Sequence, residues 1–395
     1  MVQASPTHNV QAAARATRGF FLLSGIGVAA WAPMVPFAKA RLDLDEAQLG
    51  LVLLCMGLGS VGAMPLAGFL SHRHGNRPVM VFAGTLVCIA LPLLVLAPTA
   101  TLLAATLALF GAGLGVVDVA MNAHAVDVER LHGRPLMSGF HALYSIGGLA
   151  GSAAMSALLR VGVPLMACAV AAALLLLAIV ATQWRHLLVA TPVPETARRP
   201  AFSLPSLMAG LLGALAFIMF LAEGAMLDWT AVFLRSERGF AIASAGVGYA
   251  VFSVAMSIGR LTGDRVTAAL GPVRVVRYGG AVAAAGFLLA AALPWGATSL
   301  AGFVLVGLGA ANIVPVLFSA AGRIPGTAAG VALATVTGLG YAGVLSGPAA
   351  IGFVAHATSL PVALGALAGL VAIVSLGASI LRSADASIPR QEAPR

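Results

Sequence analysis

Long runs of apolar residues, each about twenty positions, alternate along the chain with short polar segments that hold most of the charges. A transmembrane helix needs about 20 apolar residues, whereas the strands of a membrane barrel alternate over about ten. These runs are continuous and rich in Leu, Ala and Gly, so they predict helices. Twelve spans are expected, at residues 19–37, 48–70, 78–96, 102–126, 136–159, 163–183, 207–234, 241–262, 275–293, 298–320, 327–355 and 360–381.

One polar stretch, residues 184–206, interrupts this pattern with four prolines and three arginines, which is typical of a linker. It divides the predicted all-α membrane protein into two halves of six helices. The expected parts are a polar N-terminal tail (1–18), a six-helix bundle (19–183), a cytoplasmic linker (184–206), a second six-helix bundle (207–381) and a C-terminal tail (382–395).

The two halves share spaced residues, which suggests parallel structural repeats. Trp31 has a counterpart in Trp229, 198 residues on. The stretch from Gly113 to Asp118 matches the stretch from Gly307 to Asn312 at an offset of 194, and GLAG at 148–151 matches GYAG at 340–343 at 192. We therefore expect two pseudo-symmetric bundles.

Composition supports this class, because 60% of the residues are hydrophobic and only 9% are charged. The net charge of +9 does not indicate nucleic-acid binding, since the basic residues lie in short loops without forming a stripe. Alternating the loops between sides places 17 of the 22 basic residues on one side. The positive-inside rule then predicts a multi-pass protein of the cell inner membrane with both termini cytoplasmic. The other side would hold Lys39, Arg41, Arg160, Arg235 and Arg238.

Two carboxylates interrupt the apolar run that begins near Leu207, in the stretch FLAEGAMLDWTAVFLRS. Glu223 and Asp228 have no adjacent Lys or Arg there, and a charge at this depth costs several kcal/mol, so each is a candidate site. Five residues turn a helix by about 500°, so the two carboxylates point to faces about 140° apart. We expect Glu223 to face a watery path, and Asp228 with Trp229 to lie near an interface. An interfacial helix end is the alternative for Asp228.

Asp118 lies mid-run in the fourth predicted span and is a further candidate for proton coupling; a polar bond between helices is its alternative. Other polar or aromatic residues in the runs are candidates to line a substrate cavity. Histidine titrates near neutral pH, although a lone histidine in an apolar helix is more often a buried core residue. For Trp31 the alternative is an interfacial anchor, and Pro33 and Pro36 after it disturb the helix. The cavity candidates are Trp31, Asn122, His124, His141, Tyr144 and Asn312.

The segment after the second span, GFLSHRHGNR, resembles the loop motif G-x-L-x-D-R-x-G-R-R of the major facilitator superfamily. It contributes Gly68, His72, Arg73, Gly75 and Arg77, with His72 where the family usually has Asp. A second-half echo, GRLTGDR, contains Gly259, Arg260, Asp264 and Arg265 and closes at Gly271. The resemblance implies that these residues latch a cytoplasmic gate; the alternative is that their charges only set the topology.

Three further stretches, DVAMNAH from Asp118, SGFHALYSIGG from Ser138 and EGAMLDW from Glu223, resemble a bacterial subfamily distantly related to fucose permease. The resemblance implies two bundles that alternate access around a central substrate site. The chain carries no phosphate-binding GxxxxGK[ST] loop and no HExxH or GxSxG motif, which argues against ATP as the energy source and against an enzyme. We expect a monomeric secondary transporter without cofactor or metal, which carries a small, sugar-like polar solute together with protons. The alternative is a proton-coupled efflux antiporter for amphiphilic drugs or metabolites.

Overall fold

A computed structural model describes residues 10–44, 46–189, 206–240 and 247–382. The chain divides into two compact units, Met1–Ser203 and Leu204–Arg395. Parts of the predicted tails (1–9 and 383–395) and of the predicted linker (190–205) lie outside the described residues.

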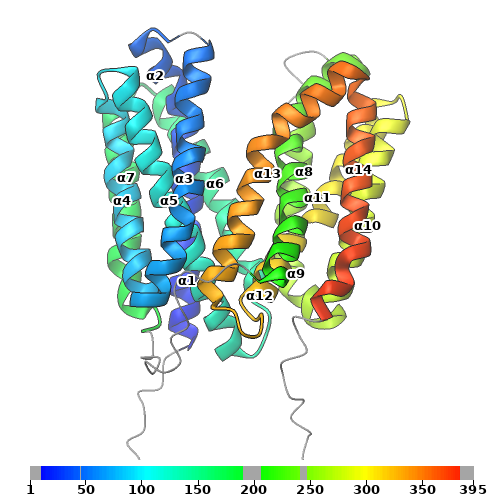
Figure 1. Ribbon diagram of the computed structural model, residues 1–395. Helices are drawn as coiled ribbons and strands as arrows, with labels where there is room; N and C mark the ends of the chain where they lie inside the picture. Colours follow the sequence, from blue (N-terminus) through cyan, green and yellow to red (C-terminus); the bar gives the residue numbers. More distant parts are fainter. Residues whose placement is uncertain (1–9, 45, 190–205, 241–246, 383–395) are drawn as a thin grey trace, which may run out of the picture. The chain divides into compact units, whose positions relative to one another are not determined.

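Each unit is a bundle of long helices, which Figure 1 shows in order of colour. The first unit contains α1 (Val10–Trp31), α2 (Val35–Leu42), α3 (Glu46–His74), α4 (Asn76–Leu96), α5 (Ala100–His132), α6 (Met137–Arg160) and α7 (Leu165–Gln183). The second contains α8 (Leu207–Arg238), α9 (Val247–Leu270), α10 (Pro272–Ala292), α11 (Gly296–Ala310), α12 (Ile313–Ala321), α13 (Ala329–Ala357) and α14 (Leu360–Gly377). The predicted all-α architecture of two bundles is confirmed.

Ten helical segments of the described chain are long and apolar enough to cross a membrane, with α11 and α12 joined as one segment, Gly296–Ala321. Two long helices fall short of this criterion, α1 and α9. Both carry charges within the helix: Arg15 and Arg18 in α1, and Arg260, Asp264 and Arg265 in α9. The chain is thus a multi-pass membrane protein, and the count of twelve spans stays a prediction that depends on α1 and α9.

The same set of helix pairs packs in both units. The first unit pairs α1 with α6, α3 with α5, and α4 with both α5 and α7. The second unit pairs α8 with α13, α9 with α11, and α10 with both α11 and α14. The two bundles therefore have the same helix packing, which confirms the internal repeat that the sequence predicts.

Glycines at equivalent helix contacts in the two bundles correct the predicted sequence offset between the repeats. A Cβ on Gly147 of α6 would meet the carbonyl oxygen of Leu22 on α1, and a Cβ on Gly343 of α13 would meet that of Phe217 on α8. These glycines lie 196 positions apart (343 minus 147). The same 196 relates four further pairs: Gly111 to Gly307, Gly113 to Gly309, Gly151 to Gly347, and the positive-φ turn residues Gly75 and Gly271. The predicted offsets of 192 and 194 were too short by four and two residues, because glycine is frequent enough here to give false matches. The offset of 198 between Trp31 and Trp229 was too long by two.

The ends of α1 differ from the predicted span 19–37. The helix begins at Val10, so it includes half of the predicted polar tail. It ends at Trp31, where a 3-10 turn (Ala32–Met34) contains Pro33, and α2 then follows. The two prolines lack the amide hydrogens that would continue the helix, so the predicted disturbance is confirmed.

Two of the arginines predicted to lie on the side with few basic residues cap helices. The Arg41 guanidinium donates to the carbonyl oxygens of Leu94 and Val95 at the end of α4. In the second unit, Arg238 donates to the carbonyl oxygens of Ala290 and Ala291 near the end of α10. The last carbonyls of a helix have no partner within it and carry partial negative charge, so a cation stabilises them. Helix capping therefore explains why these two arginines lie on the side where few basic residues are predicted.

Candidate functional site

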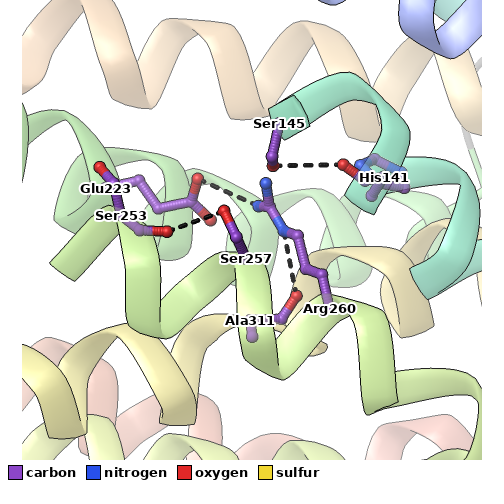
Figure 2. Close-up of polar contacts among 7 residues, drawn as sticks. All are labelled: His141, Ser145, Glu223, Ser253, Ser257, Arg260 and Ala311. Atoms are coloured by element: carbon purple, nitrogen blue, oxygen red, sulfur yellow. Dashed lines mark hydrogen bonds and ion pairs between the residues drawn. The ribbon is translucent and has the colours of Figure 1, made fainter. Parts of the chain in front are cut away.

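The Glu223 carboxylate on α8 forms an ion pair with Arg260 on α9, with 3.4 Å between Oε2 and Nη2. The side chain of Arg260 is 8% exposed and that of Glu223 is 20% exposed, so the pair is largely withdrawn from the surface. Figure 2 shows the two side chains reaching toward each other from neighbouring helices. The sequence shows no basic residue adjacent to Glu223, and the structure supplies one from another helix, 37 positions away.

Arg260 is placed by a break between α11 and α12. Pro315 has no amide hydrogen, so the Ala311 carbonyl one turn earlier loses its usual helical partner. Arg260 Nε donates to that oxygen at 3.3 Å, as Figure 2 shows. On the residue before it, the Gly259 carbonyl oxygen accepts a hydrogen bond from Asn312 Nδ2 at 3.1 Å. The helix break therefore contacts both the backbone of Gly259 and the guanidinium of Arg260.

The position of Arg260 agrees with the predicted span 241–262 and corrects its place among the loop charges and in the loop motif. It lies 11 residues before the Gly271 turn (271 minus 260), which is about 16 Å along a helix. The sequence echo GRLTGDR aligned it with a loop motif, but α9 continues through this segment to Leu270. Removing Arg260 from the loop charges leaves 16 of the predicted 17, so the charge bias remains.

Two buried polar atoms at this pair and at the helix break beside it have no hydrogen-bond partner within the described residues: Glu223 Oε1 and Asn312 Oδ1. Buried polar atoms are normally satisfied, so such exceptions call for an explanation. Both atoms are oxygens that can accept a hydrogen bond, so this site can accept a donor hydrogen at each of them.

In the first unit, three of the predicted residues form one hydrogen-bonded chain. Asn122 Nδ2 donates to the Asp118 carboxylate at 3.2 Å and to the Asp118 carbonyl at 2.8 Å. Asn122 Oδ1 lies 3.2 Å from His141 Nε2, and the His141 ring packs edge-on against Phe21 with centroids 5.1 Å apart. Asp118 and Asn122 lie one helical turn apart on α5, as their spacing predicts, and His141 comes from α6.

His124 has a partner at each ring nitrogen. Its Nδ1 lies 3.0 Å from Thr17 Oγ1 on α1, and its Nε2 accepts from the Leu188 amide at 2.9 Å. The residue is 1% exposed. This geometry favours the alternative of a satisfied core histidine that ties the start of the linker to the bundle.

The remaining candidates are scattered through the helices. Trp31 is buried where α1 ends, and its Nε1 has no partner among the described residues. Tyr144 lies on α6 where Gly25 of α1 passes close to its carbonyl oxygen. Asp228 is exposed, and although it lies near the end of the apolar segment Leu207–Thr230, α8 continues beyond it to Arg238.

The first loop motif lies at the turn between α3 and α4. His72 and Arg73 belong to the last turn of α3, and Gly75 alone forms the turn, with a φ of 82°. The guanidinium of Arg77 lies over the Trp184 ring, 4.9 Å from its centroid, a contact that the sequence pattern did not reveal. The latching role of this motif and of its echo stays a prediction.

Nearby, two acidic residues at the end of α5 make different contacts. Glu129 accepts hydrogen bonds from the amides of Leu136 and Met137 at the start of α6. Asp127 lies 4.0 Å from Arg130. Within the described residues, no three His, Cys, Asp or Glu side chains are grouped so that they could hold a metal ion.

A duplicated bundle of apolar helices with a buried ion pair and a buried polar chain is the architecture of a polytopic membrane protein. The chain belongs to the Major Facilitator Superfamily, whose sequence profile matches residues 19–324. It is 47% identical over 362 residues to an uncharacterized MFS-type transporter of Yersinia pestis, a match that covers 92% of this chain and 94% of the relative. It is 33% identical to the membrane protein MosC of Rhizobium meliloti, over 86% of this chain and 83% of that one.

Solved structures share the fold at low sequence identity. The transporter FucP in its outward conformation superposes with a TM-score of 0.79 at 17% identity, covering 93% of this chain and 98% of that one. The proton:xylose symporter XylE gives a TM-score of 0.75 at 13% identity, over 93% and 94% of the two chains. These structures show the fold, whereas membership of the superfamily and the relatives named as transporters show that the chain is a membrane transporter and not an enzyme.

Proposed function

We propose that this transporter moves a small polar, sugar-like solute by alternating access and couples the movement to protons as a symporter. The environment of the Glu223 carboxylate is the observation that supports proton coupling. One of its carboxylate oxygens is bound to Arg260, and the other is buried without a partner in the described part of the chain. A proton that binds this carboxylate changes the charge of the pair, and intramembrane carboxylates of this kind serve proton relays in transporters.

The chain from Asp118 through Asn122 to His141 is the second candidate for proton or solute binding. Hydroxylated solutes suit amide, carboxylate and imidazole groups, which donate and accept hydrogen bonds. Two solved structures with this fold are those of a fucose:proton symporter and a proton:xylose symporter, and this supports sugars as the first solutes to test. We propose that the protein acts as a monomer in the cell inner membrane, and its charge bias supports cytoplasmic termini.

The experiment measures proton movement in proteoliposomes that contain a pH-sensitive dye. L-Fucose, D-xylose and D-galactose are added outside in turn, and we expect at least one of them to drive protons inward. Glu223→Gln is expected to abolish this proton movement and to retain part of the solute exchange. Glu237→Gln, at an exposed carboxylate near the end of the same helix, is the matched control and is expected to behave like the parent. Proton-driven uptake that survives in Glu223→Gln would remove this residue from the coupling role.

The second candidate function is efflux of amphiphilic compounds by proton antiport. The chain's 13 methionines favour it, because methionine adapts to varied apolar ligands, whereas its 6% of aromatic residues does not. Overexpression that raises cellular resistance to ethidium, with no sugar-dependent proton movement in liposomes, would support efflux over symport.

A further inference from the structure

We propose that the first unit binds the phosphate of an anionic phospholipid at Arg77, Trp184 and Arg185, which together form the arginine–tryptophan cluster. The Arg77 guanidinium lies 4.9 Å from the centroid of the Trp184 ring, and the Arg185 guanidinium lies 5.3 Å from it. Arg77 comes from the start of α4, whereas Trp184 and Arg185 belong to the 3-10 turn Trp184–His186 that follows α7. Such a lipid site does not depend on which solute is transported or on proton coupling.

The arginine–tryptophan cluster lies where two membrane-spanning segments end. Arg77 is the second residue of the segment Asn76–Leu96, and Trp184 and Arg185 lie within the last three residues of the segment Leu165–His186. Because α4 packs against α7 (Figure 1) and Arg77 contacts Trp184, both ends lie on the same side of the membrane. Tryptophan is enriched at the membrane–water interface, at the level of the lipid headgroups. The cluster therefore lies at the depth where it can contact a lipid phosphate.

The two arginines of the cluster form no ion pair and no hydrogen bond with the described residues. The described residues of α1, α4, α7 and the turn after α7 include no Asp or Glu. The acidic residue Asp127 on α5 accepts a hydrogen bond from Asn76 at 3.4 Å and lies 4.0 Å from Arg130. The cluster thus presents two positive charges that an anion from outside the bundle can neutralise.

The Trp184 ring positions both guanidinium groups and leaves their N–H groups available to oxygen acceptors. A cation–π contact depends on attraction between the cation and the ring face, so it supplies no oxygen acceptor. Each guanidinium has five N–H donors, and it can bind a phosphate through two parallel hydrogen bonds. Trp184 is 37% exposed and Arg185 is exposed, so a headgroup can reach them. Trp184 is therefore a positioning residue, and the two arginines are the groups that bind the phosphate.

Exposed apolar side chains continue from the cluster along both helices, which favours a lipid over a soluble anion. They are Phe82 and Ile89 on α4, and Leu174 and Leu177 on α7. Leu177 lies two helical turns before Trp184 on the same face. The acyl chains of a lipid bound at the cluster would cover such side chains, whereas a soluble phosphate would not contact them. A zwitterionic lipid brings a cation of its own, so an anionic headgroup fits the two positive charges better.

The second unit shows that the fold does not require this cluster. The offset of 196 between the repeats puts Val273 at the place of Arg77 (77 plus 196). The 3-10 turn Ala378–Ile380 follows α14 as Trp184–His186 follows α7, and it contains no aromatic or charged residue. Both units have the same helix packing, so this packing forms without the cluster. A binding role explains why the first unit has two arginines and a tryptophan here.

Lipid binding is measured on the full-length protein in detergent by native mass spectrometry. Dioleoyl phosphatidylglycerol and dioleoyl phosphatidylcholine have the same acyl chains and differ in headgroup charge, and glycerol 3-phosphate is a phosphate ester without acyl chains. We expect phosphatidylglycerol to bind more tightly than phosphatidylcholine, and glycerol 3-phosphate at the same concentration should not displace it. Equal binding of the two lipids, or displacement by glycerol 3-phosphate, would overturn the proposal.

Arginine variants connect lipid binding to the cluster. A basic residue close to an anionic headgroup changes the affinity about fivefold. Arg77→Gln/Arg185→Gln should therefore bind phosphatidylglycerol about 25-fold more weakly and phosphatidylcholine as the parent does. Arg185→Gln alone changes an exposed side chain, so it should fold and bind about fivefold more weakly. Arg274→Gln, at an exposed arginine near the start of α10, is the matched control and should keep parental affinity. Parental affinity in Arg185→Gln, or an equal loss in Arg274→Gln, would refute this site.

Fluorescence quenching tests whether the lipid lies beside Trp184. Lipids brominated on the acyl chains near the headgroup quench tryptophans that they contact. The chain has four tryptophans, so the quenching of Trp184→Phe is subtracted from that of the parent. We expect the Trp184 contribution to be larger with brominated phosphatidylglycerol than with brominated phosphatidylcholine. An equal contribution with both lipids would contradict an anionic lipid site at this ring, whatever solute the protein carries.

Discussion

Removing Arg260 while Glu223 remains is expected to destabilise the second bundle far more than removing both. Two unit charges 3.4 Å apart attract each other by roughly 5 kcal/mol at an effective dielectric constant of 20. The loss of solvation offsets much of this attraction, so the intact pair adds little net stability. A lone carboxylate keeps the solvation cost without the attraction. We therefore expect Arg260→Gln to lower the free energy of unfolding by about 3–5 kcal/mol.

The double variant Glu223→Gln/Arg260→Gln should lie within about 1 kcal/mol of the parent, because replacing a buried pair by neutral groups is often close to neutral. Titration with sodium dodecyl sulfate in mixed micelles measures the free energy of unfolding for the parent, both single variants and the double variant. Arg235→Gln controls for the general effect of losing an arginine. The reasoning is refuted if the double variant is as unstable as Arg260→Gln, or if Arg260→Gln unfolds like the parent.

Three further predictions concern positions that the fold explains. Pro315→Ala restores an amide that competes with Arg260 for the Ala311 carbonyl, so proton-coupled uptake should slow while the thermal midpoint stays within a few degrees of the parent; unchanged uptake would argue against this positioning. Arg238→Ala leaves the end of α10 uncapped, which should cost about 1–2 kcal/mol in detergent titration; an unchanged midpoint would contradict the capping role. Gly147→Ala places a Cβ 2.5 Å from the Leu22 carbonyl oxygen and should destabilise the first bundle, whereas Gly62→Ala, with nothing within 4 Å, should not; equal thermal midpoints would argue against this packing.

The sequence by itself determined the membrane class, the helical architecture and the division into two similar halves. Apolar runs of about twenty residues have few alternatives in a bilayer, where every backbone polar group must be satisfied within the segment. The same reasoning located Asp118 and Asn122 on one face of a helix, because helical spacing is fixed. It also made Glu223 a candidate site, because burying a carboxylate in an apolar helix is costly wherever its partner lies.

Only the tertiary structure decided what the charged residues contact. Arg260 belongs to a sequence pattern that reads as a loop, yet α9 continues through it and brings the arginine to Glu223. His124 looked like a cavity residue, but Thr17 and the Leu188 amide occupy its ring nitrogens. The repeat offset was also settled only by which glycines approach which backbones. Hydrophobic periodicity depends on each helix alone, whereas an ion pair, a buried histidine and a close helix crossing depend on how helices far apart in sequence pack together.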